Sequence, residues 1–214
     1  MTRTENSTKN MYTGLIYQVL VLLFRFITRT VFIYCLGEKY LGINGLFSNI
    51  LNLLSLADLG IGSALVFALY KPIAEKNEER QKIIVDYLHK IYIYIGLAII
   101  AIGIMLLPAL KFIIKDNVDF VNLNIVFLIY IFQTASTYLF FPSKTEFLCA
   151  NQQRYIYNNI ANLIVILSNI FQIIVLIIFK NFIVYLIIKT DSFRGVISEL
   201  LSVFYIPLKE SWIL

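Results

Sequence analysis

The most constraining feature of the chain is an apolar run over residues 11–36 that carries Arg25 and Arg29 near its middle. A run of this length can cross the hydrocarbon core of a bilayer, which takes about 20 helical residues. A guanidinium that faces lipid at mid-bilayer costs from roughly 2.5 to more than 10 kcal/mol, so each arginine needs water or protein around it. Their spacing of four residues places both on one face of a helix. The sequence therefore predicts a transmembrane helix with one cationic face.

Two interpretations of these arginines stay open at the level of sequence. In the first, the helix lines an interior cavity with a positively charged wall, which suits an anionic cargo or an anionic lipid headgroup. In the second, both arginines pair with acidic residues on neighbouring helices and have a structural role only. Snorkelling to the membrane interface suits them poorly, because each lies several residues from the nearer end of the run.

The composition is that of a helical protein with several membrane spans. Of the 214 residues, 59% are hydrophobic and 14% are charged, and the mean hydropathy is +0.79. A soluble globular domain carries about 25% charged residues. The net charge of +5 does not indicate nucleic-acid binding, because the basic residues lie between apolar runs instead of forming one patch. Two cysteines and one histidine are too few for a metal site, and we predict no metal, cofactor or catalytic residue.

Apolar runs predict an all-α, polytopic membrane helical bundle with five clear transmembrane helices and a truncated sixth. The five runs cover residues 11–36, 41–70, 91–114, 121–141 and 156–179. The sixth begins at Phe182 and stays apolar only to Ile188, which is too short to cross a bilayer. The polar stretch 71–90 predicts an amphipathic surface helix after Pro72. An excess of Lys and Arg on the connections that share a side with the amino terminus predicts that this terminus is cytoplasmic.

Polar residues inside the predicted spans form a second informative set. They are Asn44, Asn49, Asn52, Ser55 and Asp58 in the second span, Gln133, Thr134, Ser136 and Thr137 in the fourth, and Asn158, Asn159, Asn162, Asn169 and Gln172 in the fifth. Such residues usually join helices by hydrogen bonds, and a hydrated pathway needs the same chemistry. We take Asn49, Asn52, Gln133 and Asn162 as candidates for a polar cavity. Asp58 is the natural partner of the two arginines if the first two helices pack as a hairpin.

The order of residues resembles a known family in two places. Residues 25–77 read RFITRTVFIYCLGEKYLGINGLFSNILNLLSLADLGIGSALVFALYKPIAEKN, and residues 137–163 read TYLFFPSKTEFLCANQQRYIYNNIANL. The first block closely resembles the amino-terminal signature of bacterial polysaccharide-repeat flippases of the Wzx type, in the multidrug/oligosaccharidyl-lipid/polysaccharide exporter superfamily. The second resembles the segment around their fourth and fifth helices.

This resemblance implies one lobe of a two-lobe exporter fold that surrounds a central cavity. Residues 1–188 would form the amino-terminal lobe, and residues 189–214 a divergent or out-of-frame tail. The family is not enzymatic. Its members move an undecaprenyl-pyrophosphate-linked oligosaccharide across the bacterial cytoplasmic membrane during surface polysaccharide biosynthesis. By the same resemblance, Arg25 and Arg29 would bind the pyrophosphate, with Asp58 as an ion-pair or coupling partner.

The length of the chain qualifies this expectation. Alternating access needs two lobes that move against each other, so a lone lobe is expected to be a truncated form of doubtful activity unless a homodimer or a second-lobe partner completes it. Two alternatives belong to other classes: a membrane polymerase or ligase of polysaccharide assembly, and a structural membrane subunit without transport. The polymerase and ligase need a sizeable outer loop, for which residues 115–120 offer little room.

Overall fold

The computed structural model describes residues 3–55, 60–110, 114, 122–139, 147, 150 and 154–189. Over these residues the chain is helical and has no strand. The helices are α1 (Arg3–Leu36), α2 (Glu38–Ser55), α3 (Ile61–Ala74), α4 (Glu78–Leu106), α6 (Leu123–Leu139), α8 (Arg154–Phe179) and α9 (Phe182–Ile188). The predicted all-α bundle is therefore confirmed for this part of the chain.

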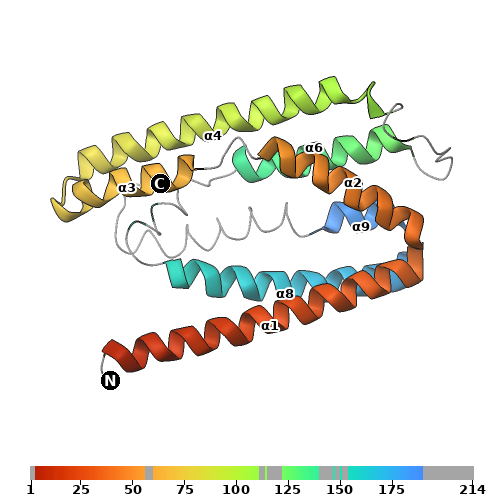
Figure 1. Cartoon of the computed structure of the whole chain (residues 1–214), viewed down its shortest axis with the longest axis horizontal. Coiled ribbons are helices and arrows are strands. Elements are labelled where there is room, and N and C mark those ends of the chain that lie inside the picture. Colours follow the sequence, from red (N-terminus) through yellow and green to blue (C-terminus); the bar gives the residue numbers. More distant parts are fainter. Residues whose placement is uncertain are drawn as a thin grey trace.

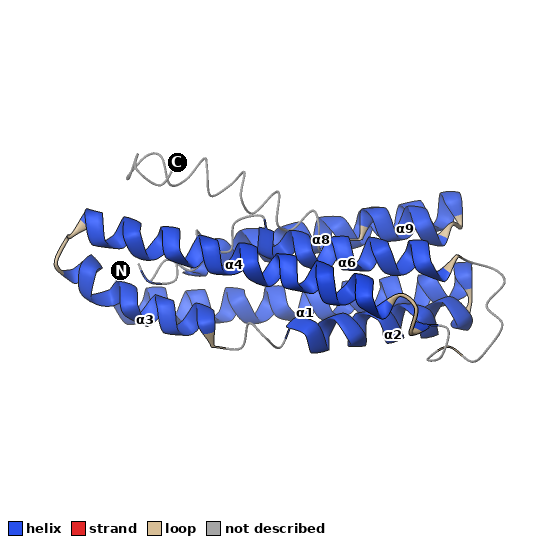
Figure 2. Cartoon of the chain, turned by 90° about the horizontal axis from the view of Figure 1, so that it is seen from above, coloured by secondary structure: helices blue, strands red, loops and turns tan. Residues whose placement is uncertain are grey.

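The helices form two rows that are joined at one end (Figure 1). In one row α1 packs along α8, and in the other α4 packs along α6 with α3 beside α4. Helix α2 contacts both α1 and α6 and so connects the rows, while the short α9 contacts α8 and α6. The axes of the long helices lie roughly parallel or antiparallel to one another (Figure 2). This arrangement leaves α9 between the rows, near the turn from α1 to α2.

The predicted second span, residues 41–70, is divided into two helices. Helix α2 ends at Ser55 and α3 begins at Ile61, directly after Gly60. Gly60 has a φ of 100°, a left-handed backbone conformation that glycine adopts readily and that a right-handed helix does not contain. The apolar run in the sequence continues across this position, which is why hydropathy predicts one helix where there are two.

The predicted surface helix over residues 71–90 is also not a separate element. Pro72 lies inside α3, and α4 begins at Glu78 and continues without a break to Leu106. The Asn77 side chain caps α4 by accepting a hydrogen bond from the Arg80 backbone N–H at 3.0 Å. Glu78 and Glu79 in the first turn favour the same start through the helix dipole. The polar segment is thus the first part of an otherwise apolar helix.

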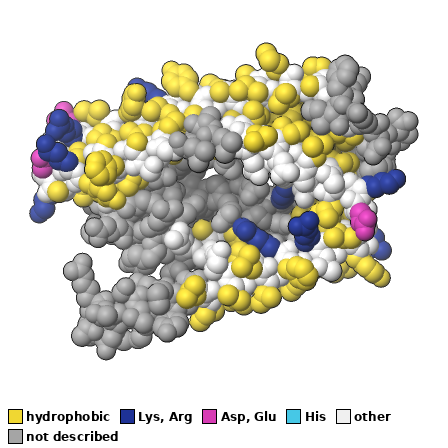
Figure 3. Space-filling view, viewed as in Figure 1, with side chains coloured by type: hydrophobic (Ala, Val, Ile, Leu, Met, Phe, Trp, Pro, Cys, Tyr) yellow, Lys and Arg dark blue, Asp and Glu magenta, His cyan; other side chains and the backbone are white. Residues whose placement is uncertain are grey.

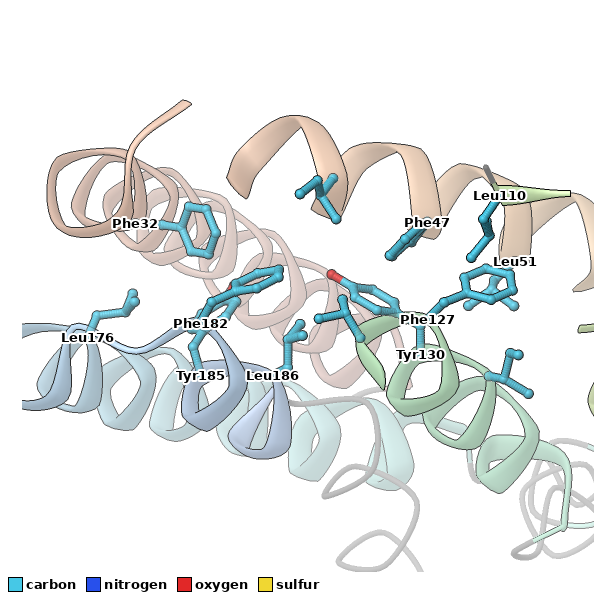
Figure 4. Packing of buried hydrophobic residues seen from close by; sticks show 13 residues of the cluster. Phe32, Phe47, Leu51, Leu110, Phe127, Tyr130, Leu176, Phe182, Tyr185 and Leu186 are labelled. Carbon is cyan, nitrogen blue, oxygen red and sulfur yellow. The ribbon is translucent and has the colours of Figure 1, made fainter. Parts of the chain in front are cut away.

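An aromatic core holds α9 between the two rows (Figure 4). Phe32 of α1 packs edge-on against Tyr185 of α9 with ring centroids 4.9 Å apart. Phe47 of α2 packs on Phe127 of α6, also at 4.9 Å. All four side chains are buried, and aromatic pairs of this kind add about 0.5–1.5 kcal/mol beyond their buried area. The core fixes where α9 ends, and that end forms part of the site.

Three helical segments are long and apolar enough to cross a membrane. They are Leu15–Leu36, Glu78–Leu106 and Ala161–Phe179, and two shorter apolar helices are Ile61–Ala74 and Leu123–Leu139. Large apolar side chains cover the outside of the bundle, with Phe26 72% and Met105 77% exposed. An apolar exterior of this extent suits lipid. The described residues thus form a membrane-type helical bundle with three helices of spanning length, where the sequence predicts five.

Candidate anion-binding site

A cavity of about 410 Å³ lies between α1, α2, α8 and the end of α9. Its volume falls in the range of about 300–1,000 Å³ that is usual for small-molecule sites. The space-filling view shows a hollow between the two rows, with Lys and Arg side chains on its lower side (Figure 3). The described lining residues are Arg25, Thr28, Arg29, Phe32, Leu41, Asn44, Gly45, Ser48, Asn49, Val165, Asn169, Gln172, Tyr185 and Lys189.

Helix α1 brings both predicted arginines to this cavity. Arg25, Thr28, Arg29 and Phe32 follow each other at intervals of three, one and three residues, so that they share one face of α1. Both arginine side chains are exposed, and neither makes an ion pair with a described residue. Asp58, the partner predicted from the sequence, lies outside the described residues. The two guanidinium groups are therefore accessible from the cavity.

A buried polar contact fixes the rotation of α1 about its own axis. The single hydroxyl proton of Thr28 is shared between two acceptors, the Phe24 carbonyl of its own helix at 2.8 Å and Asn169 Oδ1 of α8 at 3.1 Å. Asn169 Nδ2 donates in turn to the Val165 carbonyl at 2.7 Å. Because Thr28 lies between Arg25 and Arg29 on the same face, this contact keeps both arginines directed at the cavity.

A second part of the cavity wall, at the end of α9, is supported by a contact among three helices. Lys189, the residue that follows α9, donates from Nζ to Asn44 Oδ1 of α2 at 3.1 Å. The Tyr130 hydroxyl of α6 donates to the same Asn44 oxygen. Lys189 Nζ also lies 3.4 Å from the Tyr130 hydroxyl and 4.6 Å from the centre of its ring, a cation–π geometry. A flexible ammonium is thereby held at the cavity wall.

The charges of the lining have one sign. Among the described lining residues, three are cationic and none is acidic. The remaining polar groups are amides and hydroxyls, which donate hydrogen bonds to an anion. Arginine binds a phosphate with two parallel hydrogen bonds from its planar fork. The cavity thus has the chemistry to bind an anion that carries more than one negative charge.

Of the four other residues predicted for the cavity, one lines it and three do not. Asn49 lines the cavity, whereas Asn52 is exposed on α2 beyond it. Asn162 lies two turns before Asn169 on the same face of α8 and does not line the cavity. Gln133 is buried on α6 and donates from Nε2 to the Leu186 carbonyl of α9. The Leu186 carbonyl also accepts from the Lys189 backbone N–H, so Gln133 adds a second hydrogen bond near the end of α9 and does not line the cavity.

Sequence reasoning missed several lining residues. Val165, Asn169 and Gln172 follow the spacing of a single helical face, but Asn162 shares that face, so the spacing alone does not tell which of these polar residues line the cavity. Lys189 directly follows the sixth apolar run and is not among the residues predicted for the cavity. Tyr185, one helical turn earlier, lines the same cavity, but nothing in the sequence marks either residue as a cavity residue.

Fold and site together define a membrane-type helical bundle with a cationic internal cavity. No protein-family model, no curated protein and no solved structure matches the chain. An assignment of function therefore rests on the cavity and on the resemblance carried by residues 25–77 and 137–163.

Proposed function

We propose that the chain is the amino-terminal lobe of a polysaccharide-repeat flippase, and that its cavity binds the diphosphate of an undecaprenyl-diphosphate-linked oligosaccharide during translocation across the bacterial cytoplasmic membrane. The observation that carries the proposal is the cavity lining, in which Arg25, Arg29 and Lys189 occur with no described acidic residue. A lipid-linked diphosphate has one negative charge on each phosphate, which matches a lining of this sign.

The energetics of charge in a membrane support the proposal. A cation inside the bilayer is expensive and is retained where it faces water, protein or a ligand. Arg25 and Arg29 lie in the segment Leu15–Leu36, which is of spanning length, and make no ion pair with a described residue. Their like charges repel each other across one helical turn. A bound diphosphate would relieve this repulsion.

The helix pattern is compatible with five crossings if the second is a broken one. In this arrangement α2 and α3, which follow each other along one row in Figure 1, together form the second crossing, and α6 forms the fourth. Transporters commonly place discontinuous helices beside their substrate sites. The amino terminus would be cytoplasmic, and a second lobe or a second copy of the chain would supply the other half of an alternating-access cycle.

The test is the binding of a diphosphate-linked lipid by the whole chain in lipid nanodiscs. The probe is an undecaprenyl-diphosphate-linked disaccharide, and the reference is the same disaccharide joined to undecaprenol without phosphate. We expect the chain to prefer the diphosphate, and a variant with both Arg25→Gln and Arg29→Gln to bind it about a hundredfold or more weakly. Arg80→Gln, an exposed arginine at the start of α4, is the matched control. Equal binding of both lipids by the unaltered chain would refute the proposal.

A further inference from the structure

We infer that Lys189 is a third anion-binding residue, held in place by Asn44 and Tyr130, and that it contacts the second phosphate of the headgroup and so makes the cavity selective for diphosphates over monophosphates. The inference rests on the proposed function and names the part of the site that determines headgroup class. The three cationic residues of the cavity lie on two different helices. Arg25 and Arg29 are on α1, and Lys189 is at the end of α9.

The Lys189 ammonium is held by contacts with two other helices, α2 and α6. Its Nζ donates to Asn44 Oδ1 at 3.1 Å and lies 4.6 Å from the centre of the Tyr130 ring. The Tyr130 ring is only 3% exposed and packs against Phe47 with centroids 5.8 Å apart. A lysine stem has four flexible carbons, so its charge stays in one place only where neighbours hold it. Here α2, α6 and α9 each contribute to that placement.

The cavity has positive charge both on α1 and at the end of α9, so one anion would need two phosphates to contact both. The arginines lie one turn apart on α1, and their two forks together have enough donors to saturate the oxygens of one phosphate. Lys189 lines the same cavity from α9, together with Tyr185 one turn earlier. A monophosphate held by the arginines would leave the α9 wall without a ligand, whereas a diphosphate extends toward it.

A purely structural role for Lys189 makes a different prediction. A lysine at the carboxyl end of a helix interacts favourably with the helix dipole and with the last carbonyl groups. In that case the substitution of Lys189 would lower the thermal stability of the chain and leave its relative affinity for two ligands unchanged. The ratio of two dissociation constants therefore separates the roles, because a loss of stability affects both ligands alike.

The experiment uses the whole chain in lipid nanodiscs with farnesyl diphosphate and farnesyl monophosphate, which share one tail. We expect Lys189→Gln to raise the Kd for the diphosphate by about ten- to hundredfold, as for the loss of one charge-assisted hydrogen bond, and to change the Kd for the monophosphate by less than about threefold. Lys189→Arg should keep most of the preference. The control is Lys180→Gln, an exposed lysine at the other end of α9 that does not line the cavity.

The positioning role is tested by a double-mutant cycle. Tyr130→Phe keeps the ring and removes the hydroxyl that donates to Asn44. It should weaken diphosphate binding in the unaltered chain and have no effect in the Lys189→Gln background, because the two residues act through one charge. Equal effects in both backgrounds would show that Tyr130 acts independently of Lys189 and would overturn the positioning part of the inference.

Two results separate this inference from the proposed function. If Lys189→Gln leaves the ratio of the two dissociation constants unchanged while Arg29→Gln weakens both ligands, the inference is wrong and the proposed function stands. If the unaltered chain binds neither farnesyl phosphate and also fails to prefer the diphosphate-linked disaccharide, the proposed function fails.

A measurement on the unaltered chain covers the case in which Lys189→Gln does not fold. The amine of Lys189 can be acylated with acetic anhydride and its modification followed by mass spectrometry. Farnesyl diphosphate should slow the acylation of Lys189 and leave that of Lys180 unchanged, and farnesyl monophosphate should protect Lys189 much less. Equal protection of Lys189 by the two ligands, or none by the diphosphate, would overturn the inference.

Discussion

Thr28 on α1 and Asn169 on α8 are joined by a hydrogen bond of 3.1 Å between two side chains that are only 4% and 6% exposed. The two residues are 141 positions apart in the chain, and their contact lies at the cavity that holds Arg25 and Arg29. A buried side-chain pair between the two helices sets their relative rotation, and here it directs the cationic face of α1 inward. Stability and site geometry therefore depend on the same contact.

We predict that Thr28→Val lowers the stability of the chain by about 1–3 kcal/mol. Valine fills nearly the same space, but it leaves the buried Asn169 oxygen without its donor, and an unsatisfied buried polar group has a cost of this order. Thermal unfolding in detergent would report the change as a lower Tm. Thr30→Val is the matched control, because Thr30 is exposed and its hydroxyl donates only to the Phe26 carbonyl of its own helix. Equal shifts for the two variants would contradict the bridging role of Thr28.

Gly103 provides a second prediction, which concerns the packing of α4 on α6. A Cβ atom at Gly103 would lie 2.7 Å from Ile131 Cγ1, which is closer than real contacts allow. We expect Gly103→Ala to lower stability by about 1–3 kcal/mol through overpacking, and Ile131→Ala in the same chain to recover part of the loss.

The control for Gly103 is Gly42→Ala on α2, where nothing lies within 4 Å of the added Cβ. Alanine has the higher helix propensity, so Gly42→Ala should leave Tm unchanged or raise it slightly. A Gly103→Ala variant as stable as the unaltered chain would show that α6 can move away from α4 at little cost.

A third prediction distinguishes binding arginines from structural ones. Neither Arg25 nor Arg29 makes an ion pair with a described residue, so Arg25→Gln and Arg29→Gln should each change Tm little. Each should nevertheless weaken the binding of a diphosphate-linked lipid by about ten- to hundredfold. A large fall in Tm for either variant, with ligand affinity unchanged, would favour the alternative in which the arginines pair with acidic residues.

Part of the fold and site follows from local periodicity alone. Arg25 and Arg29 are found on one cavity face because a spacing of four residues determines their relative direction in any helix. The predicted ends of the first and fifth spans agree with the ends of α1 at Leu36 and α8 at Phe179. These features depend on residues close together in the chain, which a single sequence makes visible.

The features that sequence reasoning missed depend on distant contacts or on backbone conformation. Lys189 reaches Asn44 across 145 positions, and no pattern near either residue indicates their pairing. Gln133 has the polarity of a cavity residue, but the placement of α9 gives it a carbonyl to bind. The break before α3 depends on the left-handed conformation of Gly60, which an apolar run hides.

The last prediction concerns the orientation of the chain in the membrane. Cys35 lies near the carboxyl end of α1 and is half-buried, with a free thiol. If the amino terminus is cytoplasmic and α1 crosses the bilayer, Cys35 lies at the outer side. In intact spheroplasts of a Cys149→Ser variant, which leaves Cys35 as the single thiol, we expect a membrane-impermeant maleimide to label the chain without permeabilisation.

A Cys35→Ser variant that keeps Cys149 is the counterpart. The predicted topology puts that cysteine at the cytoplasmic face, so labelling should require permeabilisation. The opposite pattern would reverse the topology and would place the amino terminus of the chain outside the cell.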